Sequence, residues 1–195
     1  MFDADHAANG VIAAMECNNR LHDASDNFGL SGQQRIAARF GINTGEMLVG
    51  NIGSKRRFNY AAMGDAANLG SRLEGANKFY GTTILVGERS VELCGGKIEF
   101  REIDLVQVVG RANPVAIFEP LAEAGALGDD QRRLRDGFAA ALALYRAANF
   151  RDAAAAFEAL AGEDTVSEKF ARRSHAFAEN PPPDDWGGVY ILESK

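Results

Sequence analysis

The stretch RIAARFGINTGEMLVGNIGSKRRFNYAAMGDAANLGSRLEGANKFYGTTILV, residues 35–86, decides the fold. Its first part contains two short apolar segments, RIAARFGI (35–42) and EMLVGNIG (46–53), which predict two strands. The connector Asn43-Thr44-Gly45 has the composition of a hairpin turn, because Gly45 can adopt a positive φ without strain. We therefore expect these two strands to pair with each other.

The second part of the stretch predicts a helix from about Asp65 to Tyr80. Asp65 is placed to cap its first turn, and Gly81 is placed to end it. The segment TILVG (83–87) then predicts a short buried strand. A helix between strands in this order is typical of a sheet with a helix packed against it.

Moving outward, the apolar spacing predicts an amphipathic helix over residues 5–22 and a short helix over 88–94. Two strands are expected over 98–110 and 114–121, separated near Gly110 to Pro114. Helices and strands mixed in this way indicate an α+β domain, with helices on one face of a largely antiparallel sheet.

The composition changes after Leu121. Residues 122–130 are expected to form a linker, and residues 131–195 an α-helical tail with a segment containing Pro and Trp at its end. Two alanine-rich helices joined at Asn149-Phe150 have the spacing of a tetratricopeptide-like (TPR-like) hairpin. The residues expected to face inward in that hairpin are Leu142, Tyr145, Ala148, Ala153 and Phe157.

The bulk composition excludes several classes of protein. The 195 residues carry a formal net charge of -6, which gives no basic field to attract nucleic acid. No apolar run approaches the roughly 20 residues of a membrane helix. The chain as given is therefore expected to be soluble, with no nucleic-acid partner.

The quoted stretch resembles the core signature of class III adenylate and guanylate cyclases, and the match continues through FREIDLVQVVGRANPVAIFEPL. The resemblance covers residues 1–121 and implies a ferredoxin-like cyclase domain that is incomplete at its N-terminus. The ending PPPDDWGG resembles that of bacterial cyclases with a CHASE2 sensor. It implies a cytoplasmic domain of a membrane-anchored protein, whose membrane segments lie outside this chain.

The resemblance also implies the chemistry. Adenylate cyclases of this class convert ATP to 3′,5′-cyclic AMP and pyrophosphate at a dimer interface, with two Mg²⁺ or Mn²⁺ ions. Asn68 and Arg72 match the pair that orients the ribose and stabilises charge on the α-phosphate. They are four residues apart on the predicted helix, so their side chains should share one face. A capped helix start with a surface arginine is the structural alternative.

The sequence departs from the family pattern at three places. The two metal-binding aspartates are expected before Met1, and Asp3 and Asp5 do not align with them, so we assign no metal ligand. Near the purine base the chain has Ala61, which cannot hydrogen-bond through its side chain. Arg111 is a candidate for the phosphate contact that a lysine usually makes in the family. This chain alone is therefore not expected to make cyclic AMP.

Three functions remain open at this point. In the first, the chain is a fragment of an active adenylate cyclase. In the second, it is a degenerate half that pairs with a complete cyclase subunit and complements it. In the third, it is an interaction protein that binds its partner through the helical tail. The expected partners are ATP and either a second copy of the chain or a complete subunit.

Overall fold

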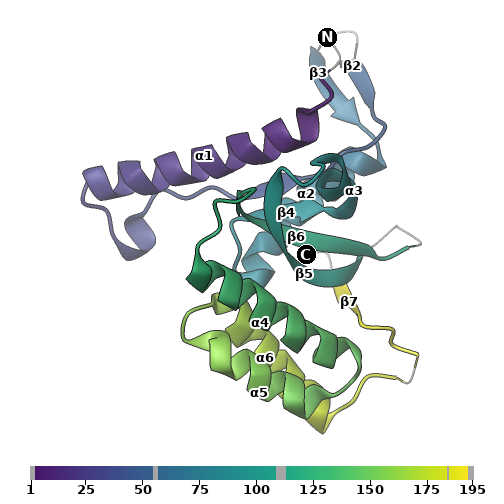
Figure 1. Cartoon of the computed structure of the whole chain (residues 1–195). Coiled ribbons are helices and arrows are strands. Elements are labelled where there is room, and N and C mark those ends of the chain that lie inside the picture. The colour runs from purple at the N-terminus through teal and green to yellow at the C-terminus, as the bar shows by residue number, and fades with distance from the viewer. Residues whose placement is uncertain (1–2, 55–56, 109–112, 184, 193–195) are drawn as a thin grey trace.

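The computed structural model describes residues 3–54, 57–108, 113–183 and 185–192. Its centre is a five-stranded sheet with helices on both faces (Figure 1). Across the sheet the strands run in the order β1 (Phe40–Ile42), β4 (Ile84–Gly87), β6 (Val115–Glu123), β5 (Ile98–Val108) and β7 (Val189–Leu192).

The sheet is mixed rather than largely antiparallel. The central strand β6 pairs antiparallel with both β4 and β5. The two edge strands pair in parallel, β1 with β4 and β7 with β5. The strand β7 lies in the segment after the prolines, for which the sequence predicts no strand.

Helices cover both faces of the sheet, so the expectation of a single covered face is wrong. The strand β4 shows why. Its residues point alternately to the two faces of the sheet, and all four are buried. Ile84 and Val86 pack with α1 (His6–Asn27) and the region of α3 (Glu88–Leu93), whereas Leu85 packs with α2 (Asp65–Tyr80) and the tail. A strand that is apolar on both sides must be covered on both sides.

The predicted pairing of residues 35–42 with 46–53 is also wrong. The strand β2 (Leu48–Ser54) pairs instead with β3 (Arg57–Met63), and the two form a separate ribbon that projects from the body (Figure 1). Gly45 is not among the positive-φ glycines, and a Cβ there would lie only 2.7 Å from Ala66 Cβ. Gly45 thus allows close packing against α2 instead of a hairpin turn.

In its described part the tail contains three helices, α4 (Asp129–Arg146), α5 (Phe150–Ala161) and α6 (Thr165–Glu179). Its aromatic residues Phe138, Phe157 and Phe170 are buried in the same core as Leu85 and Ile117 of the sheet. Ala148, which was expected to face inward, is exposed and has a φ of 58° in the turn between α4 and α5. The helices therefore pack against the sheet as well as against each other.

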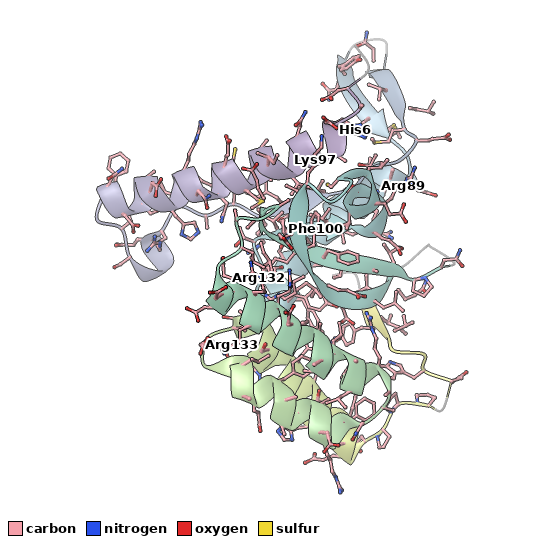
Figure 2. All side chains as sticks on the ribbon, viewed as in Figure 1. His6, Arg89, Lys97, Phe100, Arg132 and Arg133 are labelled. Carbon is pink, nitrogen blue, oxygen red and sulfur yellow. The ribbon has the colours of Figure 1, made fainter. Side chains whose placement is uncertain are left out.

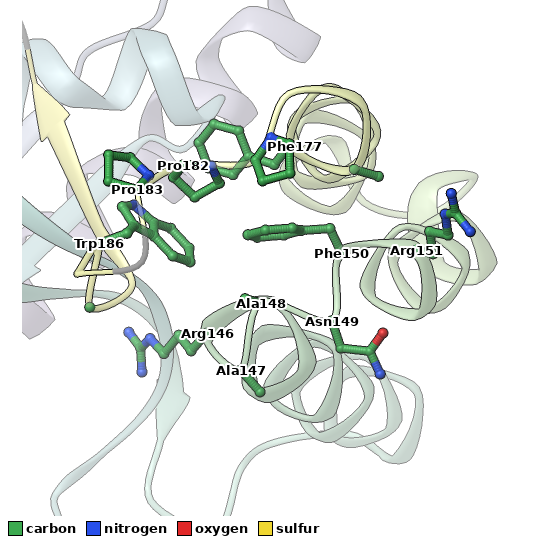
Figure 3. Close-up of a pocket in the computed structure, with 13 residues that line it drawn as sticks. Arg146, Ala147, Ala148, Asn149, Phe150, Arg151, Phe177, Pro182, Pro183 and Trp186 are labelled. Carbon is green, nitrogen blue, oxygen red and sulfur yellow. The ribbon is translucent and has the colours of Figure 1, made fainter.

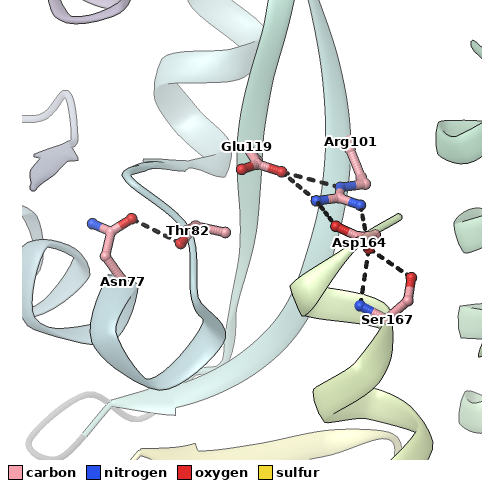
Figure 4. Close-up of polar contacts among 6 residues, drawn as sticks. All are labelled: Asn77, Thr82, Arg101, Glu119, Asp164 and Ser167. Carbon is pink, nitrogen blue, oxygen red and sulfur yellow. Dashed lines mark hydrogen bonds and ion pairs between the residues drawn. The ribbon is translucent and has the colours of Figure 1, made fainter. Parts of the chain in front are cut away.

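Two ionic contacts fix outlying elements to the sheet. Lys97 Nζ, just before β5, lies 2.6 Å from Oδ2 of Asp5, the residue before α1; Lys97 and His6 are labelled in Figure 2. On the tail side, Arg101 of β5 bridges Glu119 of β6 and Asp164, the residue just before α6 (Figure 4). Asp164 also caps α6, because its Oδ2 accepts a hydrogen bond from the Ser167 amide at 2.9 Å.

Among the helices in the described part of the chain, none has the length and apolarity needed to cross a membrane.

Candidate nucleotide-facing site

The helix α2 carries the two candidate catalytic residues. It begins after Gly64, whose φ of 147° favours glycine, and Asp65 is its first residue rather than its cap. There the carboxylate lies at the positive end of the helix dipole. At the other end Gly81 adopts the left-handed conformation with a φ of 81°, which confirms its predicted role.

The two faces of α2 differ in burial. Leu69, Leu73 and Tyr80 are 2%, 0% and 1% exposed and face the core. Asn68 and Arg72 are exposed on the other side of the helix. Because residues four apart lie one above the other on a helix, the amide and the guanidinium are presented from one face, about one turn apart.

Asn77 attaches α2 to the sheet from within the apolar face. Its Nδ2 donates to the backbone oxygen of Phe40 on β1 at 2.9 Å, and its Oδ1 accepts from Thr82 Oγ1 at 2.8 Å. Figure 4 shows the bond to Thr82. Sequence reasoning missed this residue. It could have been recognised as an amide within the predicted apolar stripe of the helix, because a buried polar side chain needs hydrogen-bond partners.

Close backbone contact brings α2 onto β1. A Cβ atom added to Gly41 would lie 2.0 Å from the Gly70 backbone oxygen and 2.3 Å from the Glu74 nitrogen. At the start of the helix, Asn43 Nδ2 donates to the Ala66 oxygen at 3.0 Å. Glycine at position 41 therefore determines how near α2 lies to the sheet.

The other two candidate residues have different outcomes. Ala61 lies on β3, half-buried and opposite Gly50, on the strand that leads through Gly64 into α2. Arg111 lies outside the described residues, as does Val109 before it. The structure thus places Asn68 and Arg72 on one helix face, with Ala61 on the preceding strand.

Two hollows in the described structure bear on the site. A groove of about 490 Å³ runs along the outer edge of β1, between α1 and α2, and its lining includes Cys17, Arg39 and Glu74. A second hollow of about 650 Å³ lies in the tail between Phe150, Phe177 and Trp186 (Figure 3). None of the candidate catalytic or nucleotide-binding residues lines either of them.

The described residues do not form a site for the metal ions of the family. They contain no cluster of three or more His, Cys, Asp or Glu side chains in a position to hold an ion. Mg²⁺ requires several oxygen ligands in near-octahedral positions. Among the described residues, the candidate site therefore consists of the Asn68 amide and the Arg72 guanidinium.

Comparison with known families gives this geometry a context. Residues 4–118 match the family described as the adenylate and guanylate cyclase catalytic domain. The match covers more than half of the chain, which therefore belongs to this family.

Characterised relatives are similar to the same part of the chain. Adenylate cyclase 1 of Rhizobium meliloti (strain 1021) is 38% identical over 117 residues, which are 60% of this chain and 18% of that protein. An adenylate cyclase of Anabaena cylindrica is 32% identical over 121 residues, 60% of this chain and 24% of that protein. The chain thus spans less than a quarter of the length of these two relatives.

Solved structures are similar as well. A bacterial light-regulated adenylyl cyclase has a TM-score of 0.50 and 14% identity, over 64% of this chain and 36% of that one. The adenylyl cyclase CyaB from P. aeruginosa has a TM-score of 0.48 and 28% identity, over 60% of each chain. The first likeness concerns the fold alone, which is the mixed α+β cyclase fold.

Proposed function

We propose that this chain is the nucleotide-facing part of a class III adenylate cyclase, which converts ATP to 3′,5′-cyclic AMP and pyrophosphate. The observation that supports the proposal is the exposed position of Asn68 and Arg72 on one face of α2, within a domain of the cyclase family. Both side chains are exposed, so a ligand that approaches this face of the helix can reach the amide and the guanidinium.

The proposed roles follow the chemistry of the two side chains. Arg72 donates hydrogen bonds from its planar fork to oxygens of the α-phosphate, where negative charge develops when the ribose 3′ hydroxyl attacks. Asn68, one turn earlier, hydrogen-bonds the ribose and orients that hydroxyl. Ala61 would lie near the purine and Arg111 near the phosphates.

The family's two Mg²⁺ or Mn²⁺ ions neutralise charge on the phosphates when they are bound. We propose that their ligands belong to residues outside this chain, either in an upstream segment or on a partner subunit. The unpaired outer edge of β1 and the groove beside it are where upstream strands would add to the described sheet. The isolated chain is then inactive.

A cyclase assay on the chain with its upstream region restored tests this function. Activity with ATP should exceed activity with GTP, in Mg²⁺ or Mn²⁺, and Arg72→Met should lower kcat by about a hundredfold or more. Lys78→Met on the same helix removes an exposed cation from its last turn, away from Arg72, and serves as the matched control. An Arg72→Met enzyme as active as this control would contradict the proposal.

A second candidate is a degenerate subunit that complements a complete one. The exposed apolar side chains of the β2–β3 ribbon favour it, because Leu48 and Tyr60 are 79% and 78% exposed and suit a protein contact. The chain would then lend Asn68 and Arg72 to the metal site of its partner. Mixing it with a cyclase whose own Asn and Arg are substituted should restore activity, and Arg72→Met should abolish the restoration.

Finer features complete the proposal. We propose that residues 1–121 form the ferredoxin-like cyclase domain, 122–130 the linker and 131–195 the tail, with α4 and α5 as one TPR-like unit. The intact protein would be bacterial and anchored to the membrane, with a CHASE2 sensor outside this chain. Cross-linking of the intact protein in membranes, compared with this chain alone, would test the anchor.

A further inference from the structure

The C-terminal turn of α2 is joined to the tail through a buried carboxylate on the sheet. Asp104 of β5 is 0% exposed, and its Oδ2 accepts hydrogen bonds from two sides. Tyr80, the last residue of α2, donates its hydroxyl at 2.7 Å, and Arg173 of α6 donates Nη2 at 2.8 Å. One carboxylate thus connects the helix of the candidate site with the last helix of the tail.

Arg173 depends on this carboxylate for its hydrogen bonding. Its buried Nε and Nη1 have no hydrogen-bond acceptor in the described structure. The guanidinium is instead enclosed by aromatic rings, with its Cζ 4.0 Å from the ring centre of Phe170 and 4.5 Å from that of Tyr190. Burial alone would lower the pKa of Arg173, but the Asp104 carboxylate raises it, so the side chain stays charged.

A second contact joins the same two helices. Lys169 Nζ of α6 donates to the backbone oxygens of Lys78, at 3.2 Å, and of Phe79. These oxygens lie at the negative end of the α2 dipole, where a cation is favourable. A Cβ on Gly81 would lie 3.0 Å from Thr165 Cγ2, so α6 begins directly against the end of α2.

The helix α2 is therefore held at both ends by different parts of the chain. Asn43 holds its first turn from the sheet side, and α6 holds its last turn. Arg72 and Tyr80 lie only about 12 Å apart along the helix, at 1.5 Å per residue. A helix is stiff over this distance. A shift of the last turn will consequently displace Asn68 and Arg72.

We propose that Arg173 is a positioning residue of the cyclase site, which acts through Asp104 and Tyr80 to fix where α2 presents Asn68 and Arg72. This inference rests on the proposed function. A displacement of about 1 Å in a catalytic group can lower a rate by as much as about a hundredfold. The tail thereby becomes a part of the enzyme that sets turnover without touching the nucleotide.

The test compares the variants Arg173→Met and Arg172→Met of this chain in the complementation assay. There the chain is mixed with a cyclase whose own Asn and Arg are substituted. Arg172 is the neighbouring residue on α6, is 68% exposed and pairs only loosely with Glu168 at 3.6 Å, which makes it a matched control. Because Arg173→Met leaves Asp104 without its cation and can impair folding, Tyr80→Phe is the second variant. It removes one hydroxyl and leaves the Arg173–Asp104 pair intact.

Two measurements are made on each variant. The kcat with ATP should fall about tenfold or more in Arg173→Met and Tyr80→Phe, with KM within about twofold of the unmodified chain. Hydrogen exchange of α2 amides, taken relative to α5 amides in the same sample, should accelerate in both. Arg172→Met should change neither quantity. The ratio to α5 separates movement of α2 from general loss of stability.

Failure of the two proposals can be told apart. If the unmodified chain restores no activity, its role as a complementing subunit is contradicted, while the exchange ratio still tests the coupling of α6 to α2. If it restores activity and both variants keep its kcat, Arg173 is not a positioning residue. An unchanged α2-to-α5 exchange ratio in both variants would overturn the inference equally.

Discussion

The tail and the β2–β3 ribbon both extend from the central sheet, but they handle their apolar residues in opposite ways. In the tail, Phe138, Phe157 and Phe170 are no more than 1% exposed. In the ribbon, Leu48 and Tyr60 are nearly four-fifths exposed, and no third strand joins β2 and β3 in the described structure. An isolated two-stranded ribbon is marginally stable in water. The tail buries its aromatic residues within this chain, whereas the ribbon leaves its apolar residues exposed, as the proposed contact with a partner would use them.

The largest effect should come from breaking the ionic attachment of the tail. Arg101→Met leaves Glu119 and Asp164 without their cation in a mostly buried position, and should lower the free energy of unfolding by about 3–5 kcal/mol. Chemical denaturation measures this loss. The exposed pair Arg133–Glu163 (Arg133 is labelled in Figure 2) is the control, and Arg133→Met should cost at most about 1 kcal/mol. Equal losses would mean that Arg101 does not anchor the tail.

A smaller effect on the free energy of unfolding is expected from an added Cβ at a glycine that packs closely against α2, compared with one at a glycine that has open space around it. An alanine at Gly41 would place its Cβ against backbone atoms of α2, and Gly41→Ala should lower the free energy of unfolding by about 3 kcal/mol. Gly50→Ala on the ribbon meets no atom within 4 Å and should be close to neutral. Thermal melting of both variants measures the difference. If Gly41→Ala melts at the temperature of the unmodified chain, α2 does not lie on β1 as described.

The pH dependence of the tail attachment should be detectable through Asp164. Although burial alone would raise its pKa, hydrogen bonds and charge from Arg101, together with Ser167, lower it below the usual value. The folded state then binds fewer protons than the unfolded state, so this contribution is present above about pH 4 and is lost as the pH falls further.

Asp164→Asn keeps a residue able to cap α6 and removes only the charge. At pH 7 it should lower the free energy of unfolding by about 2 kcal/mol, and the difference from the unmodified chain should shrink between pH 4 and lower pH. Denaturation at a series of pH values measures it. A difference that grows on acidification would reverse the assigned direction.

The smallest effect on stability is expected in the ribbon. Leu48→Ser should change the free energy of unfolding of the isolated chain by less than about 0.5 kcal/mol, because the side chain is already exposed. It should, however, weaken complementation of a partner cyclase. Phe28→Ser, at a residue that is 76% exposed near the end of α1, is the control and should leave complementation unchanged. Equal loss in both variants would indicate a general effect of lost apolar surface.

The parts that the sequence predicts well are those decided by local chemistry. The helix α2 is predictable because apolar residues recur at helical spacing and Gly81 can adopt a positive φ. The shared face of Asn68 and Arg72 follows from their spacing on that helix. Their roles toward a nucleotide remain predictions, as does the assignment of Arg111.

The parts that it predicts poorly depend on distant partners. Residues 46–53 form a strand as expected, but the choice of β3 over 35–42 is made by the close packing of Gly41 and Gly45 against α2. The roles of Asn77 and Tyr80 could likewise not be predicted from the sequence, because the residues that they hydrogen-bond are 37 and 24 positions away in the chain. Polar contacts of this kind have no periodic signature.

The place of β7 at the edge of the sheet has a consequence for biosynthesis. Its register with β5, from Leu105↔Val189 to Val108↔Leu192, joins strands that are separated by β6 and all three tail helices. A nascent polypeptide emerging from the ribosome would expose the open side of β5 throughout translation of that intervening stretch. Chaperones that shield unpaired strands during synthesis should therefore matter most for this protein in the interval before Val189 is made.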